Sequence, residues 1–550
     1  MLVYGDQKRT VDLRKTLSEL ARENGAFLSH DRIRARFLLL AEVTQAVADA
    51  DFDTSGVDRL RPGEEALLAQ LVAHGAALMT SFDRHCAGGV APSVQEVPDL
   101  PQHAVAKLPE GYAFYALYPE AYGLAARTLR LEAPPRVIGL RSIGTGLGAI
   151  AAAALGSPTP VTLRPRGDPF ARSLRLDPAL IHRLAEGEAH YVIVDEGPGL
   201  SGSSFGAVAD WLEERGILST RIAFLPGHDG ALGPQASERH ARRWAEAQRP
   251  VAQVDRLRTW AEQLVGPISR WEDLSGGTWR PLWSAREAEW PAVTPMWERA
   301  KFRVQSPSGC WLMRFAGLGA AGEEKLALAQ HFEEAGFGTE VAGLTHGWLV
   351  QRWHEEARPA RPRLDELIAY LRLRSGLAAE PGASLPELVT MVRRNAPALA
   401  DWNPPVDYLQ TRSRTVRIDG RMQSHEWLRL PDGRLLKADA LDHHQAHDLV
   451  GCQDLAWDVA GAAIELDLSD EEVARLEQAL GVSPELTAFH RIAYAAFRLG
   501  AHRMSETMVG GEEVARHRRD ARRYELALVD AVEHPGDVDQ PLGLRVEAGP

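Results

Sequence analysis

Two adjacent carboxylates follow an apolar stretch in VIVDEGPGLSGSSF, residues 192–205. The apolar stretch predicts a buried strand, so Asp195 and Glu196 stand at its exit, where they could hold ribose hydroxyls directly or through a divalent cation. The loop 197–204 adds backbone N–H groups, serine hydroxyls and a helix start, which together suit a phosphate. The pattern predicts a ribose-phosphate site; the alternative is a solvated turn in a generic doubly wound domain.

The stretch resembles the PRPP-binding motif of type I phosphoribosyltransferases, in which an apolar strand leads through two acids and small residues to Thr-Gly. Asp195 and Glu196 match the acidic pair, but Ser replaces the usual Thr and the spacing is one residue longer. The residues that match the phosphate loop are Gly199, Ser201, Gly202, Ser203 and Ser204. The resemblance covers residues 108–275. It implies that PRPP is a co-substrate, that a nitrogen nucleophile displaces its pyrophosphate, and that Asp195 and Glu196 act in catalysis and hold Mg²⁺.

Two upstream segments extend this resemblance. In the family, the loop after the first strand contacts pyrophosphate, and GLRSIGTGLG (139–148) stands there. The PRPP-binding residues implied in it are Arg141, Ser142, Gly144 and Thr145. The Arg-rich segment 163–178 stands where the family has a mobile catalytic loop, so Arg166 and Arg172 are expected to close over the diphosphate. The alternative for these arginines is a solvated basic loop.

From residue 301 onward, the order of hairpin strands, a helix, two more strands and many helices resembles the aminoglycoside phosphotransferase and choline kinase superfamily. The resemblance implies a small β-rich lobe, a large helical lobe and ATP. Arg314 stands at the position of the nucleotide-binding Lys, with Glu323 or Glu324 as its candidate helix partner. Asp439 falls at the Mg²⁺-binding acid, and Glu426 takes the place of the metal-binding Asn.

The catalytic-base position of this resemblance is altered. Arg421 occupies it, and an arginine cannot accept a proton at pH 7. Asp419, two residues earlier, is the candidate substitute, so kinase activity stays open. One alternative is a non-catalytic nucleotide sensor built on two enzyme folds that have lost their catalytic activity. Another is a metal-dependent hydrolase built on His443, His444 and His447.

Composition limits the remaining classes. A chain of 550 residues is too long for a single hydrophobic core, so we expect about three domains. The charge of −13, from 62 Lys and Arg against 75 Asp and Glu, disfavours nucleic acid as a partner. Three scattered cysteines suit a reducing compartment. The N-terminus lacks an apolar signal core, and the longest small-apolar run, 149–156, is too short to span a bilayer. We therefore expect a cytoplasmic protein with small-molecule substrates and no membrane partner, and a homodimer as one arrangement.

Periodicity gives the elements that must position these residues. Helical spacing runs through 10–90, where Thr10 is the expected first N-cap and the helices form a cap or an oligomerisation surface. Apolar strands alternate with helices through 108–275, which predicts a parallel sheet covered on both faces. Near the end, Ser469 to Glu472 predicts a capping box.

The fold class expected is α/β multidomain. Its parts are a helical N-terminal region (1–107), a parallel-sheet phosphoribosyltransferase-like domain (108–275), a linker (276–300), a C-terminal kinase-like α+β domain (301–535) and a tail (536–550). The function expected is a PRPP-dependent phosphoribosyltransferase with an appended kinase-like domain, acting in a nucleoside or nucleotide pathway.

Overall fold

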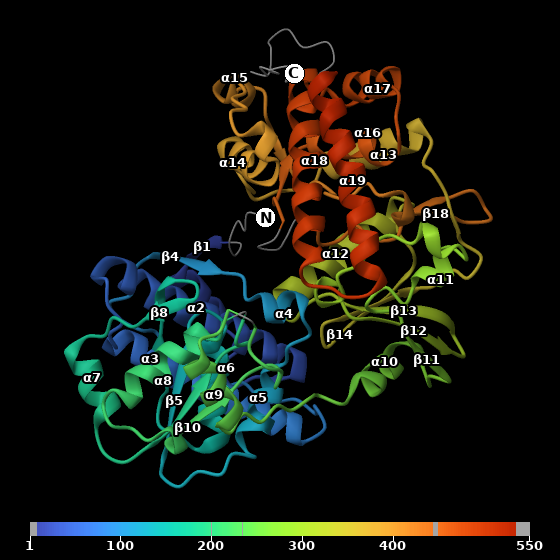
Figure 1. Ribbon diagram of the computed structural model, residues 1–550. Coiled ribbons are helices and arrows are strands. Elements are labelled where there is room, and N and C mark those ends of the chain that lie inside the picture. The colour runs from blue at the N-terminus through green and yellow to red at the C-terminus, as the bar shows by residue number, and fades with distance from the viewer. Residues whose placement is uncertain (1–7, 200, 234, 444–448, 535–550) are drawn as a thin grey trace.

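The computed structural model describes residues 8–199, 201–233, 235–443 and 449–534. Figure 1 shows two bodies: the first, blue to green, contains the N-terminal helices and a parallel sheet, and the second contains an antiparallel sheet and a helical lobe coloured up to red. Within the described ranges, no helix is both long and apolar enough to cross a membrane.

The N-terminal region is helical, as its periodicity predicts. Its elements are β1 (Lys8–Asp12), α1 (Leu13–Ala21), β2 (Phe27–Leu28), α2 (His30–Ser55), α3 (Pro62–Asp83), β3 (Gly89–Val90), β4 (His103–Lys107), α4 (Glu110–Phe114) and α5 (Pro119–Ala126). The first helix begins later than expected. Thr10 lies in β1, and the side chain of Asp12 caps α1 by accepting the N–H of Lys15 at 2.9 Å.

A four-stranded parallel sheet occupies the middle third, in the strand order β10-β9-β5-β6. The elements here are β5 (Pro135–Leu140), α6 (Gly144–Leu155), β6 (Val161–Leu163), α7 (Pro178–Ala185), β9 (His190–Val194), α8 (Ser203–Glu213), β10 (Ile222–Leu225), α9 (Glu238–Glu246) and α10 (Leu257–Val265). Between β6 and α7, β7 (Arg166–Asp168) and β8 (Ala171–Ser173) form an antiparallel hairpin. The four predicted strands are therefore present in a parallel arrangement.

Helices cover both faces of this sheet. Val192 and Val194 of β9 share a buried cluster with α6 and the N-terminal helices, whereas Tyr191 and Ile193 face a second cluster with α7 and α8. Because side chains alternate along a strand, a near-continuous apolar strand needs cover on both sides. The helices of the predicted 1–107 region supply part of this cover, so they share one core with the sheet.

The second body starts with a five-stranded antiparallel sheet in the order β11-β12-β13-β15-β14. Its elements are β11 (Arg270–Asp273), β12 (Lys301–Ser306), β13 (Gly309–Phe315), α12 (Ala320–Glu334), β14 (Val341–Thr345) and β15 (Trp348–Arg352). A helical lobe follows. Its helices are α13 (Leu364–Ser375), α14 (Leu385–Asn395), α15 (Val406–Gln410), α16 (Ala456–Glu465), α17 (Asp470–Leu480), α18 (Pro484–Glu506) and α19 (Glu512–Glu533). Its short strands are β16 (Arg358–Pro359), β17 (Thr415–Val416), β18 (Trp427–Arg429), β19 (Leu435–Lys437) and β20 (Gln453–Asp454).

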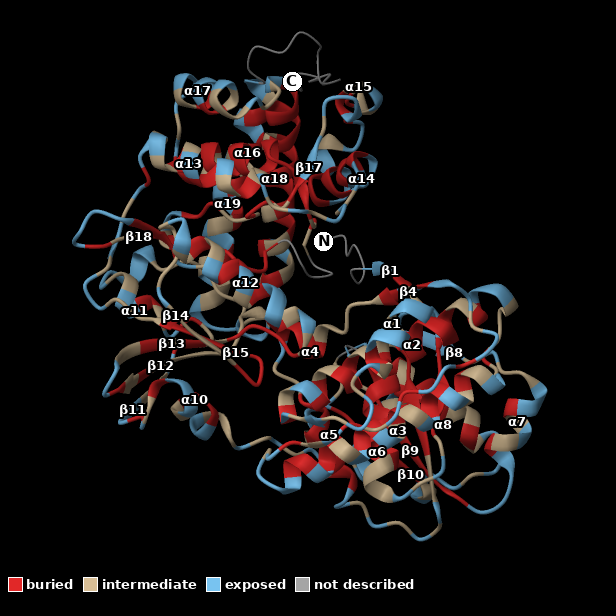
Figure 2. Ribbon diagram, turned by 180° about the vertical axis from the view of Figure 1, so that it is seen from behind, coloured by how far each residue is buried: buried red, intermediate tan, exposed pale blue. Residues whose placement is uncertain are grey.

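The capping box predicted at the start of α17 is present. Ser469 and Glu472 form the predicted capping box at the start of α17, because each side chain accepts a backbone N–H of the other. Figure 2 shows that buried residues run through α16 and α18, which form the centre of the helical lobe.

The segment 280–297, most of the predicted linker, packs onto the helical lobe; we call it the strap. It begins with α11 (Arg280–Trp283). Arg280 pairs with Glu513 of α19 at 2.7 Å, and the Thr294 hydroxyl donates to Ser505 of α18 at 2.8 Å. The strap therefore connects the antiparallel sheet to the α18–α19 pair.

Candidate functional site

The carboxyl end of β9 lies at the point where the strand order of the parallel sheet reverses. The helices α6 and α8, which follow the neighbouring strands β5 and β9, pack on opposite faces. In open α/β sheets, ligands bind at such a point, beyond the carboxyl ends of the strands. A Cβ atom on Gly144 would lie 2.7 Å from the Val194 carbonyl oxygen and 3.6 Å from an Asp195 carboxylate oxygen. The structure thus brings Gly144 and Asp195 together.

The first acid of the pair has a perturbed pKa. Burial raises the pKa of Asp195 to about 7, although its carboxylate accepts the N–H of Glu196 at 2.9 Å. A buried carboxyl is partly protonated at neutral pH under these conditions, and a cation beside it would favour ionisation.

Groups from the helical region surround the second acid. Tyr122 of α5 donates to the carbonyl oxygens of Asp195 and Glu196, at 3.0 and 3.2 Å. The Tyr112 hydroxyl of α4 is buried with no hydrogen-bond partner among the described residues, and burial followed by the charge of Glu196 raises its pKa. No local motif in the sequence marks either tyrosine as a site residue.

The loop after the acids contacts the β7–β8 hairpin. The hydroxyls of Ser201 and Ser203 both donate to the Pro169 carbonyl oxygen, at 3.2 and 2.6 Å. Gly199 and Gly202 have φ of +58° and +64°, in the left-handed region that favours glycine. Ser204 follows in the first turn of α8 and is partly exposed. Two hydroxyls expected to bind a phosphate are therefore directed to the hairpin instead.

The arginines predicted for the diphosphate have protein partners. Arg141 is buried, and it pairs with Asp58 and, at 3.6 Å, with Asp49. Burial lowers its pKa to about 10. On the exposed hairpin, Arg166 lies 3.5 Å from Asp53, and Arg172 donates to the Pro165 carbonyl at 3.3 Å.

The other two residues of the predicted pyrophosphate loop lie close to Arg141. Ser142 is half-buried. The Thr145 hydroxyl is buried without a hydrogen-bond partner among the described residues.

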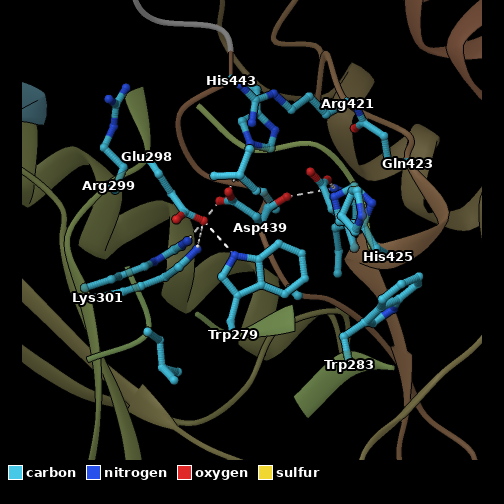
Figure 3. Close-up of a pocket in the computed structure, with 18 of the residues that line it drawn as sticks. Trp279, Trp283, Glu298, Arg299, Lys301, Arg421, Gln423, His425, Asp439 and His443 are labelled. Carbon is cyan, nitrogen blue, oxygen red and sulfur yellow. Dashed lines mark hydrogen bonds and ion pairs between the residues drawn. The ribbon is translucent and has the colours of Figure 1, made fainter. Parts of the chain in front are cut away.

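The second body contains a cavity of about 610 Å³ between the antiparallel sheet, the strap and the helical lobe. Figure 3 shows Trp279 and Trp283 on one side of it and Asp439 at the centre. The Trp279 indole N–H donates to Glu298 at 2.7 Å, and its ring stacks on His425 with centroids 5.6 Å apart. Both tryptophans lie in the segment 276–300, which the sequence predicts as a linker.

An ion pair crosses the cavity wall. Arg314 of β13 lies 3.0 Å from Asp439, which follows β19. The other carboxylate oxygen of Asp439 contacts His443 at 3.1 Å. Burial alone would lower the pKa of His443, but the charges of Asp439 and Glu426 raise it to about 9. His443 is therefore protonated at neutral pH.

A second ion pair lies beside the first. Asp442 contacts Lys325 of α12 at 3.6 Å and Arg299 at 3.2 Å. Burial lowers the pKa of Lys325 to about 8, against the opposing charge of Asp442. No motif in the sequence marks Lys325. The candidate helix partner Glu324 pairs with Arg417 at 2.6 Å, and Arg314 pairs with Asp439 instead.

The loop that carries Arg421, at the altered base position, is fixed by hydrogen bonds to Asp458. The Asp458 carboxylate accepts the backbone N–H groups of Asp419 and Gly420, at 2.7 and 2.8 Å. Asp419 has no exposed side-chain surface and does not line the cavity. Its carboxylate accepts from Tyr370, Arg374 and Lys437. Glu426 also contacts Lys437, and burial raises the Glu426 pKa. These two acids face a buried ion network.

Among the described residues, two groups of side chains could hold a cation, and His443 would have to release its proton to act as a ligand in either. Asp439, Asp442 and His443 form one set, Asp419, Glu426 and His443 form the other, and within each set the ligand atoms lie within 4.8 Å of one another. Two histidines of the predicted hydrolase cluster, His444 and His447, lie outside the described residues.

The Gly-rich turn before α12 is closed by protein. Gly317 has φ of +118°, and a Cβ atom there would lie 3.0 Å from the Ala113 carbonyl oxygen. The turn thus rests against α4.

No family model matches the sequence, and no curated protein matches it. Several solved structures are similar. A choline kinase from Streptococcus pneumoniae is 14% identical, with 41% of this chain and 90% of that chain covered and a TM-score of 0.30. A Plasmodium vivax ethanolamine kinase is 10% identical, with 54% of this chain and 90% of that chain covered and a TM-score of 0.30. A putative fructosamine-3-kinase from Thermobifida fusca is 14% identical, with 50% and 100% covered and a TM-score of 0.28.

These three neighbours are small-molecule kinases by name. Nothing in the comparisons supports the phosphoribosyltransferase interpretation of the middle third.

Proposed function

We propose that the second body binds a nucleoside triphosphate in its cavity and transfers the terminal phosphoryl group to a small-molecule hydroxyl. The observation that carries this proposal is the meeting of Arg314, from the antiparallel sheet, with Asp439, from the helical lobe, at the wall of the 610 Å³ cavity. A cavity of this size suits a nucleotide-sized ligand.

The charges near Asp439 support a polyphosphate ligand. Arg314, Lys325 and Arg299 lie on the sheet side of the cavity, and each contacts a carboxylate. Arginine binds phosphate oxygens in a bidentate manner, and lysine acts as a point charge. A phosphate chain would take the place of these carboxylates as their counter-charge.

The carboxylates also fit Mg²⁺. Asp439 keeps 40% of its side chain exposed, and Asp442 lies within ligand reach of it. Magnesium prefers oxygen ligands, usually one or two carboxylates together with substrate phosphates. When bound, Mg²⁺ would neutralise charge on the phosphates. The role proposed for Asp439 and Asp442 is to hold it.

The proposed transfer exchanges one phosphorus–oxygen bond for another. A bond forms between the acceptor oxygen and the γ-phosphorus while the γ-phosphorus–bridging oxygen bond breaks. The nucleoside diphosphate leaves with that electron pair, and the acceptor's proton passes to solvent. Positioning and electrostatics supply most of the catalysis in this chemistry. We therefore assign no base role to Asp419, which does not line the cavity.

The test is calorimetric titration with Mg²⁺–ATP, followed by ³¹P NMR of reactions with a panel of sugars and amino alcohols. We expect binding, and Asp439→Asn should lower turnover at least 100-fold. Asp365→Asn, at an exposed position in α13, is the matched control. Absence of ATP binding at millimolar concentration would overturn the proposal.

A second candidate function, phosphoribosyl transfer, concerns the first body. It is favoured by Asp195, whose carboxyl lies at the switch point of the parallel sheet with a pKa raised by burial to about 7. Asp195 and Glu196 would hold the ribose diol or Mg²⁺, and the Ser201–Ser203 loop would bind the 5′-phosphate after leaving Pro169.

Its test is titration with Mg²⁺–PRPP and a pyrophosphate-release assay with nitrogen nucleophiles. Asp195→Asn combined with Glu196→Gln should abolish binding. Pro169→Ala should leave it intact, since only the backbone carbonyl of Pro169 contacts the serines. PRPP affinity unchanged in the double variant would remove this candidate.

A further inference from the structure

The wall of the cavity is strongly basic, although the protein is acidic. Among the described residues that line it, twelve are Lys or Arg and seven are Asp or Glu. The whole chain has the opposite balance, 62 against 75. An excess of fixed positive charge around an enclosed space favours an anionic ligand. The cations also lie on both sides of Asp439, because Figure 3 places Arg299 and Lys301 on one side and Arg421 on the other.

Most of these cations have carboxylate partners in the protein. On the sheet side, Lys301 lies 2.6 Å from Glu298, and Arg314 and Lys325 pair with Asp439 and Asp442. Two arginines near His425 differ. Among the described residues, neither Arg421 nor Arg498 has a carboxylate within ion-pair distance, and the Nε atom of each is buried with no hydrogen-bond partner. Both line the cavity.

The backbone fixes Arg421 in place. Asp458 holds the two residues before it, and the Arg421 N–H donates to Asp419 at 3.2 Å. Arg498 projects from α18 and lies over the Tyr524 ring, 5.4 Å from its centroid. The nearby Glu465 accepts hydrogen bonds from Tyr494, Tyr524 and Arg523 and does not pair directly with Arg498. Among the described residues, neither guanidinium group is therefore paired with a carboxylate, and only the more distant charges of Glu465 and Asp439 act on Arg498 and Arg421.

His425 completes this corner. It lines the cavity, and its ring stacks on Trp279 with centroids 5.6 Å apart. An imidazole N–H can donate a hydrogen bond to an anion.

We propose that Arg421, Arg498 and His425 form a subsite for a phosphomonoester carried by the acceptor. This inference rests on the proposed phosphoryl transfer and names its acceptor class: a small molecule with a free hydroxyl and a phosphate. The nucleotide phosphates lie on the Arg314 side of Asp439, and the acceptor phosphate lies on the Arg421 side. The arginine at the base position then binds the acceptor instead of accepting its proton. A phosphoribosyl product belongs to this class.

The test separates this subsite from nucleotide binding. Calorimetry would measure ribose 5-phosphate, ribose and glycerate, each with and without Mg²⁺–ATP. We expect ribose 5-phosphate to bind at least tenfold more tightly than ribose or glycerate. Arg421→Gln should weaken ribose 5-phosphate binding at least fivefold and change ATP affinity less than twofold. Arg518→Gln, at an exposed position in α19, is the control.

Arg498→Gln provides a second variant, because Arg498 also packs on Tyr524; its thermal midpoint shows whether it folds. Equal binding of ribose and ribose 5-phosphate would overturn the subsite, as would unchanged phosphate affinity in both variants. Glycerate binding as tightly as ribose 5-phosphate would overturn the phosphomonoester assignment. Ribose 5-phosphate binding that depends on Arg421, without any ATP binding, would retain the subsite and remove the proposed transfer.

Discussion

The ammonium group of Lys325, in the cavity of the second body, donates a hydrogen bond to the Ala113 carbonyl oxygen of α4 at 3.2 Å. The same short helix touches the parallel-sheet site, because a Cβ atom on Gly111 would lie 2.9 Å from the Glu196 carboxylate. The Tyr112 carbonyl also accepts the N–H of Leu318 in the Gly-rich turn at 2.9 Å. Three consecutive residues of α4 thus join the two candidate sites.

Gly111→Ala tests this connection. The added methyl group would meet Glu196 and Ile143 at 2.9 Å, so α4 must shift. We expect a loss of about 1–3 kcal/mol in urea unfolding, typical of overpacking. We also expect weaker Mg²⁺–ATP binding in the distant cavity. Gly510→Ala is the control, because nothing lies within 4 Å of its Cβ position. Unchanged ATP affinity in a folded Gly111→Ala protein would show that α4 does not couple the sites.

Arg314→Met tests the charge across the cavity. The substitution removes the cation 3.0 Å from Asp439 but keeps an apolar side chain of similar length. Loss of a charge-assisted contact to phosphate, worth roughly 1.5–3 kcal/mol, should weaken Mg²⁺–ATP binding at least tenfold in calorimetry. Arg314→Lys should recover part of the affinity. Arg270→Met, exposed on β11, should bind as the native protein does. Equal affinity for Arg314→Met and Arg270→Met would contradict the assignment.

Glu64 predicts a pH effect on stability away from both sites. It is 2% exposed, and burial raises its pKa to about 8, against the opposing effect of the Thr162 hydroxyl, which donates to it at 3.2 Å. The folded state therefore holds a proton that the unfolded chain releases near pH 4.5. By linkage, stability present below pH 4.5 is lost as the pH rises towards 8.

Glu64→Gln removes that titration and keeps an acceptor for Thr162. We expect the variant to be more stable than the native protein at pH 9, by on the order of 1–4 kcal/mol, and close to it at pH 4. Denaturant unfolding between these pH values measures the difference. Glu65→Gln, the more exposed neighbour that pairs with Arg183, should follow the native curve. Parallel curves for Glu64→Gln and the native protein would refute the prediction.

The sequence predicted local features well where the signal is local. The strands β5, β9 and β10 are short apolar runs, and a run of this kind needs cover on both faces of its sheet. The capping box at Ser469 needs only residues three positions apart. Thr10 shows the limit: Asp12, two residues later, forms the cap.

The cavity could not be predicted from the sequence, because the residues that line it are far apart in the chain and no local motif connects them. The sequence predicts a linker around Trp279 and Trp283, because their partners on the helical lobe lie more than a hundred residues away. Arg498 lies in an ordinary amphipathic helix, and its importance comes from its buried Nε atom and the neighbouring His425. Lys325 follows the predicted Glu324 directly, but the helix turns Glu324 towards Arg417 and Lys325 towards Asp442.

Lys437→Met tests whether the ion network behind the cavity is structural. Lys437 has no exposed side-chain surface; it contacts Asp419 at 3.3 Å, Glu426, and the Asp439 carbonyl oxygen at 2.7 Å. Its removal would leave two buried carboxylates without their shared cation. Breaking such a pair typically costs about 3–5 kcal/mol, so we expect a large decrease in unfolding free energy. Lys437→Met combined with Glu426→Gln should recover part of the loss, because one uncompensated charge is gone. Lys301→Met, which removes the partly exposed partner of Glu298, should cost much less. A single Lys437→Met variant as stable as Lys301→Met would mean that Asp419 and Glu426 are not held by this ammonium group.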